Sequence, residues 1–421
     1  MLTDLFDDYL SVELEETIET IPLESEQIDC ALQLSRETPA DKQWSVYLQQ
    51  LAQFGFKNWL NKREPQLEIN YLDSIPSLES ICLLQIGEFK VCLIPTNSFS
   101  ELDIIIPRAV LELPEFAAHF YISIGVAEDL ELIGILGFLN YNQLAEYRSQ
   151  LQSLIDWTYM IPREQFNPIT DELLLNLQCL TSSAISLPAI PNNRQAELNA
   201  VKTQLATLLP QVKNRPLWQV LNWNEAKALL THSSLIKWLN HSQPSLGLSE
   251  LLQLLTQPAI ELGTWLQNQF NDVSQSLEWQ PLPVPVMRGN ISTVSPSPTP
   301  VNELEDILKQ LQNQHQIQVP LEAACRRENL PNEIQLYAIT WLKPQQEWAL
   351  LLIVTTPSEA VNPPKIQWYI SDENHILIDR KLRPELGQTY LFTQILGEIG
   401  ERFLVNLRID DNLETTHVFT F

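Results

Sequence analysis

The chain has 421 residues, more than one hydrophobic core normally supports, so two or three domains are expected. Hydrophobic residues make up 44% and charged residues 19% of the chain, which excludes an intrinsically disordered protein. The net charge of −26 excludes phosphate backbones and anionic lipid as general partners, and it either attracts a basic protein or serves solubility alone.

The first 34 residues are predicted to be an acidic amphipathic leader. Residues 1–30 hold ten Asp and Glu and no Lys or Arg, and apolar residues recur among them at a roughly helical spacing. Three of these apolar residues, Leu5, Phe6 and Tyr9, are candidate contacts with a partner. The pattern suits docking on a basic, partly apolar groove of another protein, and packing on its own domain is the alternative.

An α+β domain is predicted over residues 35–180. A helix is expected over 38–61, because Thr38 suits the N-cap, Pro39 suits the first turn, and apolar residues follow at helical spacing. The remaining elements are two hairpins, a further strand and a helix, at 81–87 with 89–95, 119–129 with 130–140, 103–107, and 140–148. Together they favour one mostly antiparallel sheet with helices beside it.

A small helical region is predicted over residues 194–280, where helical stripes alternate with prolines. Its last helix, 262–279, carries one apolar stripe opposite a polar face of Gln, Asn, Ser and Asp. Trp265 and Phe270 lie in that stripe, so they either pack within the region or form part of a partner-binding groove. A Pro-rich linker is predicted over 281–300.

A β-sandwich with a short leading helix is predicted over residues 301–421. The helix is expected at 301–314, and seven short strands are expected at 334–342, 347–356, 365–371, 374–382, 389–396, 402–409 and 415–421. Apolar and polar residues alternate in 402–409, which is typical of a strand with one buried face. Short strands at such close spacing indicate two packed sheets, so the chain as a whole is predicted to be of the α+β class.

The sequence contains no motif that predicts a catalytic residue, a cofactor or a metal ligand. Glycine-rich phosphate loops, a nucleophile elbow and paired zinc-ligand spacings are all missing. The five cysteines show no C-x-x-C spacing and are expected to be reduced thiols. Cys92 and His119 are the one pair expected on a shared sheet, where a core thiol is the favoured interpretation and a catalytic pair is the alternative.

Nucleic-acid binding and membrane insertion are not predicted. No stripe of basic residues interleaves with aromatic ones, and the basic doublets are Lys62-Arg63, Arg326-Arg327 and Arg380-Lys381. No apolar run approaches the roughly 18–20 residues of a membrane span, and the acidic start of the chain differs from that of a signal peptide. A cytoplasmic protein is therefore expected.

Three segments share a recurring pattern with known sequences. They are 108–144, with a Leu-Pro-Glu helix start and a paired hairpin, 215–223 (RPLWQVLNW), and above all 261–279 (ELGTWLQNQFNDVSQSLEW). On these segments the chain resembles a cyanobacterial family, the domain-of-unknown-function family numbered eighteen twenty-two. The resemblance spans nearly the whole chain and implies the same order of hairpin, Trp-bearing helix, Pro-rich linker and β-rich tail. It implies no catalytic residue.

Two functional hypotheses follow from the sequence. We expect a non-enzymatic adaptor or regulator that binds another protein through acidic and apolar surfaces, with the leader as one contact and the sandwich as a second. The alternative is an enzyme of an unrecognised type, with its site between the α+β and the helical domains. Convergent polar groups with perturbed pKa values in a cleft favour the enzyme, whereas acidic patches and exposed Trp favour the adaptor.

Overall fold

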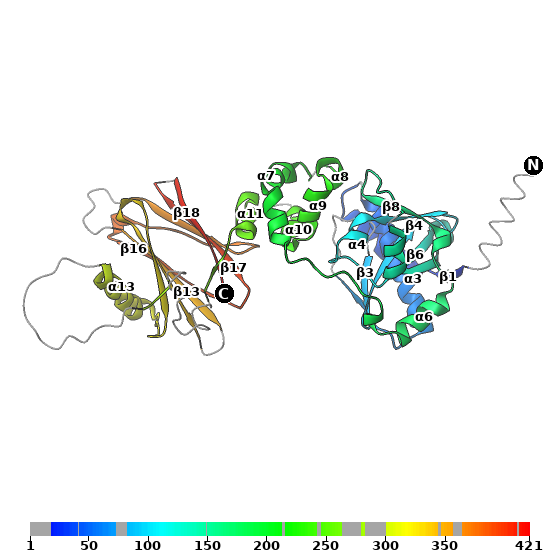
Figure 1. Ribbon diagram of the computed structural model, residues 1–421, viewed down its shortest axis with the longest axis horizontal. Coiled ribbons are helices and arrows are strands. Elements are labelled where there is room, and N and C mark those ends of the chain that lie inside the picture. Colours follow the sequence, from blue (N-terminus) through cyan, green and yellow to red (C-terminus); the bar gives the residue numbers. More distant parts are fainter. Residues whose placement is uncertain are drawn as a thin grey trace, which may run out of the picture. The chain divides into compact units, whose positions relative to one another are not determined.

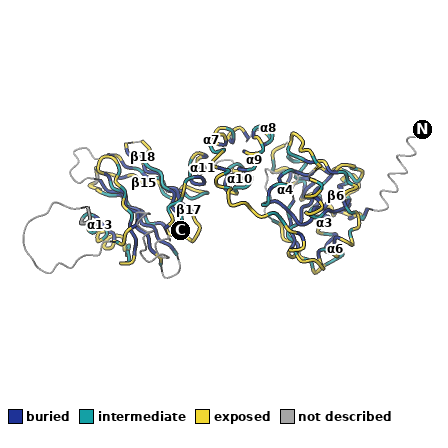
Figure 2. Tube along the Cα trace, in the orientation of Figure 1, coloured by how far each residue is buried: buried dark blue, intermediate teal, exposed yellow. Residues whose placement is uncertain are grey.

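The chain folds into two compact units, Met1–Ser242 and Gln243–Phe421. Each unit combines helices with mostly antiparallel sheets, which confirms the predicted α+β class (Figure 1). Buried residues concentrate along the strands of each unit and exposed residues along the loops (Figure 2). The computed structural model describes residues 18–40, 42–72, 82–148, 150–212, 215–241, 246–262, 279–282, 300–343, 347–356, 364–410 and 412–421.

The first unit is built on a six-stranded sheet with the strand order β1-β7-β6-β4-β3-β2. β4 and β6 are parallel and all other neighbours are antiparallel, as the sequence predicts. Gly87 makes the predicted tight turn between β3 and β4 with a φ of 55°, a conformation that glycine adopts without strain. The strands are β1 (Glu19–Pro22), β2 (Ile69–Tyr71), β3 (Cys82–Ile86), β4 (Phe89–Thr96), β6 (Phe120–Ala127) and β7 (Leu132–Asn140).

The central strand β6 is buried on both faces of this sheet. Phe120 and Ile122 share a core with Phe56 of α3, while the hydroxyl of Tyr121 donates to the Val110 carbonyl of α4 at 2.8 Å. The helices packed around the sheet are α2 (Ser25–Arg36), α3 (Gln43–Arg63), α4 (Arg108–Glu112), α5 (Tyr141–Arg148) and α6 (Thr170–Cys179). Burial on both faces explains why this strand reads as a nearly continuous apolar run.

The helix α3 lies close enough to β7 to require a glycine at one position. A Cβ built on Gly55 would lie 2.3 Å from Cγ1 of Ile133, well inside van der Waals contact. By sequence alone this glycine only weakens the helix, because glycine has a low helix propensity. The tertiary structure shows that it permits the close approach of helix and sheet.

Part of the predicted leader belongs to the fold of the first unit. Ile18 is buried, and Glu19–Pro22 form the edge strand β1 against β7, followed by α2 packed on α3. The predicted helix start at Thr38 is wrong, because the Thr38 hydroxyl donates to the Ser35 carbonyl at the end of α2 and α3 begins at Gln43. The candidate contacts Leu5, Phe6 and Tyr9 lie outside the described residues.

A two-stranded sheet of β5 (Asp103–Pro107) and β8 (Thr158–Pro162) and a group of four helices complete the first unit. The helices are α7 (Arg194–Val212), α8 (Leu217–Val220), α9 (Trp223–Leu230) and α10 (Ser233–Asn240). α9 begins with a capping box, in which Asn222 and Glu225 each accept a backbone hydrogen bond from the other. The predicted helix at 262–279, with Trp265 and Phe270, lies almost entirely outside the described residues.

The second unit is a sandwich of two five-stranded sheets, with the orders β10-β11-β12-β13-β16 and β15-β14-β17-β18-β9. Leu350 and Leu352 of the first sheet share one core with Trp368 and Leu407 of the second. The strands are β9 (Ile260–Glu261), β10 (Gln280–Pro281), β11 (Ala324–Asn329), β12 (Gln335–Leu342), β13 (Trp348–Thr355), β14 (Ile366–Ser371), β15 (Ile376–Lys381), β16 (Tyr390–Gly397), β17 (Arg402–Ile409) and β18 (Asn412–Thr420). All seven predicted strands are present, and β9, β10 and β11 are additional.

A helix covers the outer face of each sheet of the sandwich. Leu311 of one helix packs on Ile339 of β12, and Leu254 of the other packs on Leu404 of β17. The two helices are α13 (Pro300–His315), close to the predicted range, and α11 (Leu248–Thr256). Because helices cover the outer faces, β13 is buried on both faces. This explains why its residues 349–354 (ALLLIV) are continuously apolar and do not alternate with polar residues.

Candidate functional site

A cluster of polar side chains lies where α4, α5 and β8 meet α9 in the first unit. Glu112 of α4 is at its centre, with a side chain only 11% exposed. Its carboxylate contacts four partners: Arg108 Nε at 2.9 Å, Arg148 Nη2 at 3.3 Å, the Tyr159 hydroxyl, which donates at 2.5 Å, and Trp223 Nε1, which donates at 3.1 Å. This one carboxylate therefore links three elements of the α+β part to the helical part.

Aromatic rings enclose one side of this Glu112 cluster. The Arg108 guanidinium lies over the Trp223 ring, 4.4 Å from its centroid, and Trp157 meets the same ring edge-on at 5.5 Å. The Trp157 carbonyl in turn accepts a hydrogen bond from the Arg108 amide at 2.7 Å. Cation–π and edge-to-face contacts of this kind add to the stability that the charges provide.

The Glu112 cluster keeps the Glu112 carboxylate ionised and is not suited to proton transfer. Burial raises the pKa of Glu112, but hydrogen bonds from Arg108 and Tyr159 and the charges of Arg108 and Arg148 outweigh burial and lower the pKa below its ordinary value of 4.5. Burial and the contact with Glu112 raise the pKa of Tyr159. At neutral pH the carboxylate is ionised, the phenol is protonated, and each is engaged by the other. The arrangement therefore acts as a clamp.

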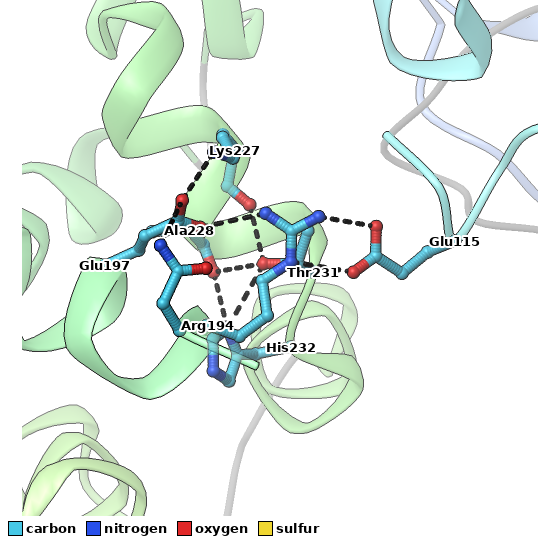
Figure 3. Close-up of polar contacts among 8 residues, drawn as sticks. Glu115, Arg194, Glu197, Lys227, Ala228, Thr231 and His232 are labelled. Atoms are coloured by element: carbon cyan, nitrogen blue, oxygen red, sulfur yellow. Dashed lines mark hydrogen bonds and ion pairs between the residues drawn. The ribbon is translucent and has the colours of Figure 1, made fainter. Parts of the chain in front are cut away.

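A second polar network includes Glu115, which follows Glu112 by three residues. Arg194, at the start of α7, makes a two-pronged contact with Glu115, through Nε to Oε1 and Nη2 to Oε2, both at 2.9 Å. Its Nη1 donates to Glu197 at 2.8 Å, and Glu197 also binds Nζ of Lys227 at 2.6 Å. Figure 3 shows Arg194 reaching from the helical part to Glu115 on the adjoining loop. The Arg194 side chain is 11% exposed, so these charges are largely screened from water.

Glu112 and Glu115 thus fasten the helical part to the α+β part from neighbouring positions. The alternative enzyme site predicted from the sequence lies at this junction. Polar side chains do converge at the junction, but each of them forms its ion pair or hydrogen bond with another side chain of the same network. Burial raises the pKa of Glu197, and the contacts with Lys227 and Arg194 more than reverse that, so this carboxylate also remains ionised. The network connects α7 and α9 to each other as well as to the loop that carries Glu115.

We expect acidification to weaken this junction. The pKa values of Glu112 and Glu197 are lowered in the fold, so the stability they contribute is fully present above the ordinary pKa of 4.5 and is lost as the pH falls through the folded values. The melting temperature of the first unit, followed by scanning calorimetry, should therefore fall below about pH 4.5.

Acidification also relieves repulsion among the 52 Asp and Glu residues. The pH dependence of the melting temperature therefore has to be compared between wild type and matched variants. Glu112→Gln removes one of the two titrating groups and should flatten the fall, whereas Glu164→Gln, at an exposed position, should not. An identical pH dependence in wild type and Glu112→Gln would show that the carboxylate is not tied to the stability of the junction.

The Cys92–His119 pair proposed from sequence does not form a catalytic arrangement. Cys92 is fully buried, and burial raises the pKa of its thiol. Nδ1 of His119 accepts a hydrogen bond from the Lys90 amide at 2.8 Å, and its ring meets Phe89 edge-on. Burial lowers the pKa of His119, so the ring is a neutral acceptor at neutral pH. The favoured interpretation of Cys92 as a core thiol agrees with this geometry.

No group of three or more His, Cys, Asp or Glu side chains in the described part of the chain is placed to hold one metal ion. His232 and His241 each place Nδ1 against the backbone carbonyl four residues earlier, at 2.8 and 2.6 Å.

Of the helices that the structure describes, none is both long enough and apolar enough to cross a bilayer.

The second unit has an open groove of about 1070 Å³ on one side of the sandwich. Its walls are the C-terminal end of α13, the strand β15, the loop 382–389 and the start of β16. The Tyr390 hydroxyl donates to Gln310 of α13 at 3.2 Å, and the His315 ring lies 4.7 Å from that of Phe392. These contacts hold α13 against β16 and make an aromatic floor for the groove.

The groove lies between two sheet edges, since β15 ends one sheet and β16 ends the other. Arg380 of β15 reaches across and donates to the Phe392 carbonyl of β16 at 3.2 Å. Elsewhere in the sandwich, His417 of β18 and Glu328 of β11 join the two sheets, with Nε2 and Oε2 2.8 Å apart. The side formed by β15 and β16 instead presents exposed side chains around a cavity.

The groove is positively charged on a strongly acidic protein. Arg380, Lys381 and Arg383 line it and are exposed, and Asp379 is its only acidic lining residue among those described. Asp379 already accepts a hydrogen bond from Gln367 at 2.7 Å. The sequence signalled this site only through the doublet Arg380-Lys381. Spacing along the chain could not show that α13 and β16 complete it.

The comparison with known families identifies the chain as a whole. A family model described as "Protein of unknown function (DUF1822)" matches residues 21–419, nearly the full length. No curated protein and no solved structure matches the chain. The match agrees with the resemblance seen in the sequence and, as its description states, it assigns no activity.

Proposed function

The chain belongs to the DUF1822 family, and we propose that it is a non-enzymatic cytoplasmic adaptor that binds another protein through the groove of its C-terminal sandwich. The observation that carries this proposal is the groove of about 1070 Å³ between the edges of both sheets and α13. It combines exposed cations, an aromatic floor and two strand edges, which are the features that recognise an extended protein segment.

The polar groups at the junction of the first unit support the same proposal. Four side chains bind the Glu112 carboxylate, and the two further charged residues around Arg194 and Glu197, Glu115 and Lys227, are paired with them. A general acid or base needs a pKa near the operating pH and access to its substrate. Glu112 and Glu197, with lowered pKa values, favour a clamp that holds the two parts of the first unit together.

The acidic leader remains a second proposed contact. Its candidate residues, Leu5, Phe6 and Tyr9, lie outside the described residues, so this part of the proposal depends on sequence alone. Because Ile18 is buried and β1 begins at Glu19, any deletion that tests the leader has to stop at residue 17. The groove and the leader can be tested separately, since they belong to different units.

Site-specific photo-crosslinking tests the groove. A photoreactive amino acid at Gln388, an exposed residue that lines the groove, should crosslink the full-length protein to one partner in its native cells. The matched control carries the same group at Ile399, which is 81% exposed in the same sandwich but does not line the groove. Mass spectrometry of the adducts identifies the partner and the crosslinked peptide.

Charge reversal in the groove completes the test. Arg383→Glu changes an exposed lining residue and should reduce the Gln388 adduct strongly, because charge complementarity contributes to protein association. Equal adducts from Gln388 and Ile399, or an adduct that Arg383→Glu leaves unchanged, would contradict binding in the groove.

A further inference from the structure

Building on the proposed groove, we infer that the bound element is an acidic, extended segment of a partner protein, which adds as a further strand to the free edge of β15. This inference depends on the proposed function and specifies the chemistry of the partner. Three observations carry it: the direction of the backbone groups of β15, the charge along that edge, and the walls of the groove beside it.

The free edge of β15 offers backbone hydrogen-bonding groups. Within the described residues β15 pairs with β14 alone. The Leu382 amide donates to the Ile366 carbonyl at 2.8 Å, which fixes Ile366 and Leu382 as a hydrogen-bonded pair. In an antiparallel ladder these pairs alternate along the strand, so Arg380 also bonds to β14. The amide and carbonyl groups of Asp379 and Lys381 therefore point away from β14, toward the groove.

The edge of β16 is less suited to receive a strand. Its Phe392 carbonyl already accepts a hydrogen bond from the Arg380 guanidinium. Ile378 packs toward the core of the sandwich, and Arg380, two residues further on the same face, also points inward and covers the neighbouring edge. The Arg380 guanidinium thus occupies a backbone acceptor on the β16 edge. β15 is therefore the edge left open.

Charge along the open edge selects an acidic partner. Lys381 and Arg383 are exposed and have no ion-pair partner among the residues that the structure describes. Asp379 is occupied by Gln367. Cross-strand pairs of opposite charge stabilise a sheet, whereas like charges placed opposite each other destabilise it. Glutamate or aspartate at alternate positions of an added strand would face Lys381 and Arg383 across the edge.

The same charges disfavour a second copy of this chain as the occupant. If two β15 strands paired about a two-fold axis at Arg380, each arginine would lie opposite its counterpart, and each Lys381 would lie opposite Asp379 of the other copy, which Gln367 already occupies. The like charges of the two Arg380 residues would face each other, and Arg383 would lie opposite the apolar Leu377. An acidic segment from another protein supplies the missing charge, and its inward-facing side chains would lie beside Leu391 of β16, which lines the groove and belongs to the shared core.

A synthetic probe tests the inference on the full-length protein. The probe is a fluorescent, capped peptide of about eight residues that alternates glutamate with valine, long enough to cover the six residues of β15. Fluorescence anisotropy should show binding that weakens as salt rises from about 50 to about 300 mM, because exposed charges are screened. The same peptide with lysine for glutamate should not bind. Combining Lys381→Glu with Arg383→Glu should weaken binding by about tenfold or more.

Two substitutions at one position separate strand addition from simple charge attraction. Asp379→Ala removes a negative charge and keeps the outward amide, so binding of the acidic peptide should stay the same or improve. Asp379→Pro removes the same charge and also the outward amide, and proline is tolerated at the free edge of a sheet. Its binding should fall by about tenfold relative to Asp379→Ala, the equivalent of about 1.4 kcal/mol. Circular dichroism and melting temperature confirm that both variants fold.

Four results would overturn the inference. Equal binding by Asp379→Ala and Asp379→Pro would exclude strand addition, and equal binding of the lysine peptide would exclude an acidic preference. A doubled mass in solution that Asp379→Pro abolishes would make a second copy the occupant. If the Gln388 crosslink persists while the acidic peptide fails to bind, the groove binds a protein by another mode. If the protein with the photoreactive group at Gln388 and no other substitution forms no adduct, the proposed function itself fails.

Discussion

Replacing Glu112 by alanine should lower the free energy of unfolding of the first unit by about 3 kcal/mol. Removing one partner of a largely buried ion pair leaves the other charges without compensation, at a cost of about 3–5 kcal/mol. The low end applies because Arg148, one of the two cations, is 45% exposed and can be hydrated. Arg108, Tyr159 and Trp223 would each lose their shared acceptor.

This loss corresponds to a fall in melting temperature of about 6–12 °C for a unit of this size. Hydrogen exchange should rise most in α9, which Trp223 begins, since Glu112 is its polar link to α4. The matched control is Glu164→Ala, which removes an exposed carboxylate from the same unit and should change stability by less than about 0.5 kcal/mol. Equal effects of the two substitutions would refute the clamp.

Replacing Trp368 by alanine should have the largest effect in the second unit. Trp368 of β14 is fully buried in the core that both sheets share. Truncating a buried tryptophan costs about 3–5 kcal/mol, because the surrounding side chains fill the cavity only in part. Chemical denaturation followed by circular dichroism should show this loss, with hydrogen exchange accelerated in β14 and β17 rather than in the first unit.

A second substitution at Trp368 serves as the control. Among the described residues its Nε1 has no hydrogen-bond partner, so Trp368→Phe removes an unsatisfied donor while keeping an aromatic ring in the core. We expect this variant to cost clearly less than Trp368→Ala. If both cost the same, the indole nitrogen contributes to stability through a contact other than packing.

Local pattern predicted the strands of this protein well. The strand at Arg402–Ile409 and the turn at Gly87 depend on a few neighbouring residues, and the structure contains both elements. The predicted single buried face of that strand is wrong, because α11 covers its second face at Leu404. The same kind of local pattern gives a wrong helix start at Thr38, because a threonine hydroxyl can cap the end of one helix as readily as the start of the next. The strand β11 was missed because its charged residues, Arg326 and Arg327, obscure a strand pattern.

The candidate sites could not be predicted in the same way. Trp223 reaches Glu112 across 111 positions of sequence, and Tyr390 reaches Gln310 across 80. The spacing of apolar residues along one element says which face it buries, but not which polar side chains another element brings to it. Arg380-Lys381 was visible as a basic doublet, whereas the open edge beside it depends on the order of strands in the sheet.

Local periodicity and composition are enough to predict the α+β class, the position of most strands and the lack of an apolar run long enough for a membrane span. The recurring segments of the sequence also identified the family. In contrast, the contacts by which Glu112 and Glu115 fasten the helical part to the α+β part, and the basic groove beside β15, are visible only in the folded chain. Ion pairs and strand edges arise between elements far apart in the chain, because helix docking and strand order, rather than local spacing, set the distances between them.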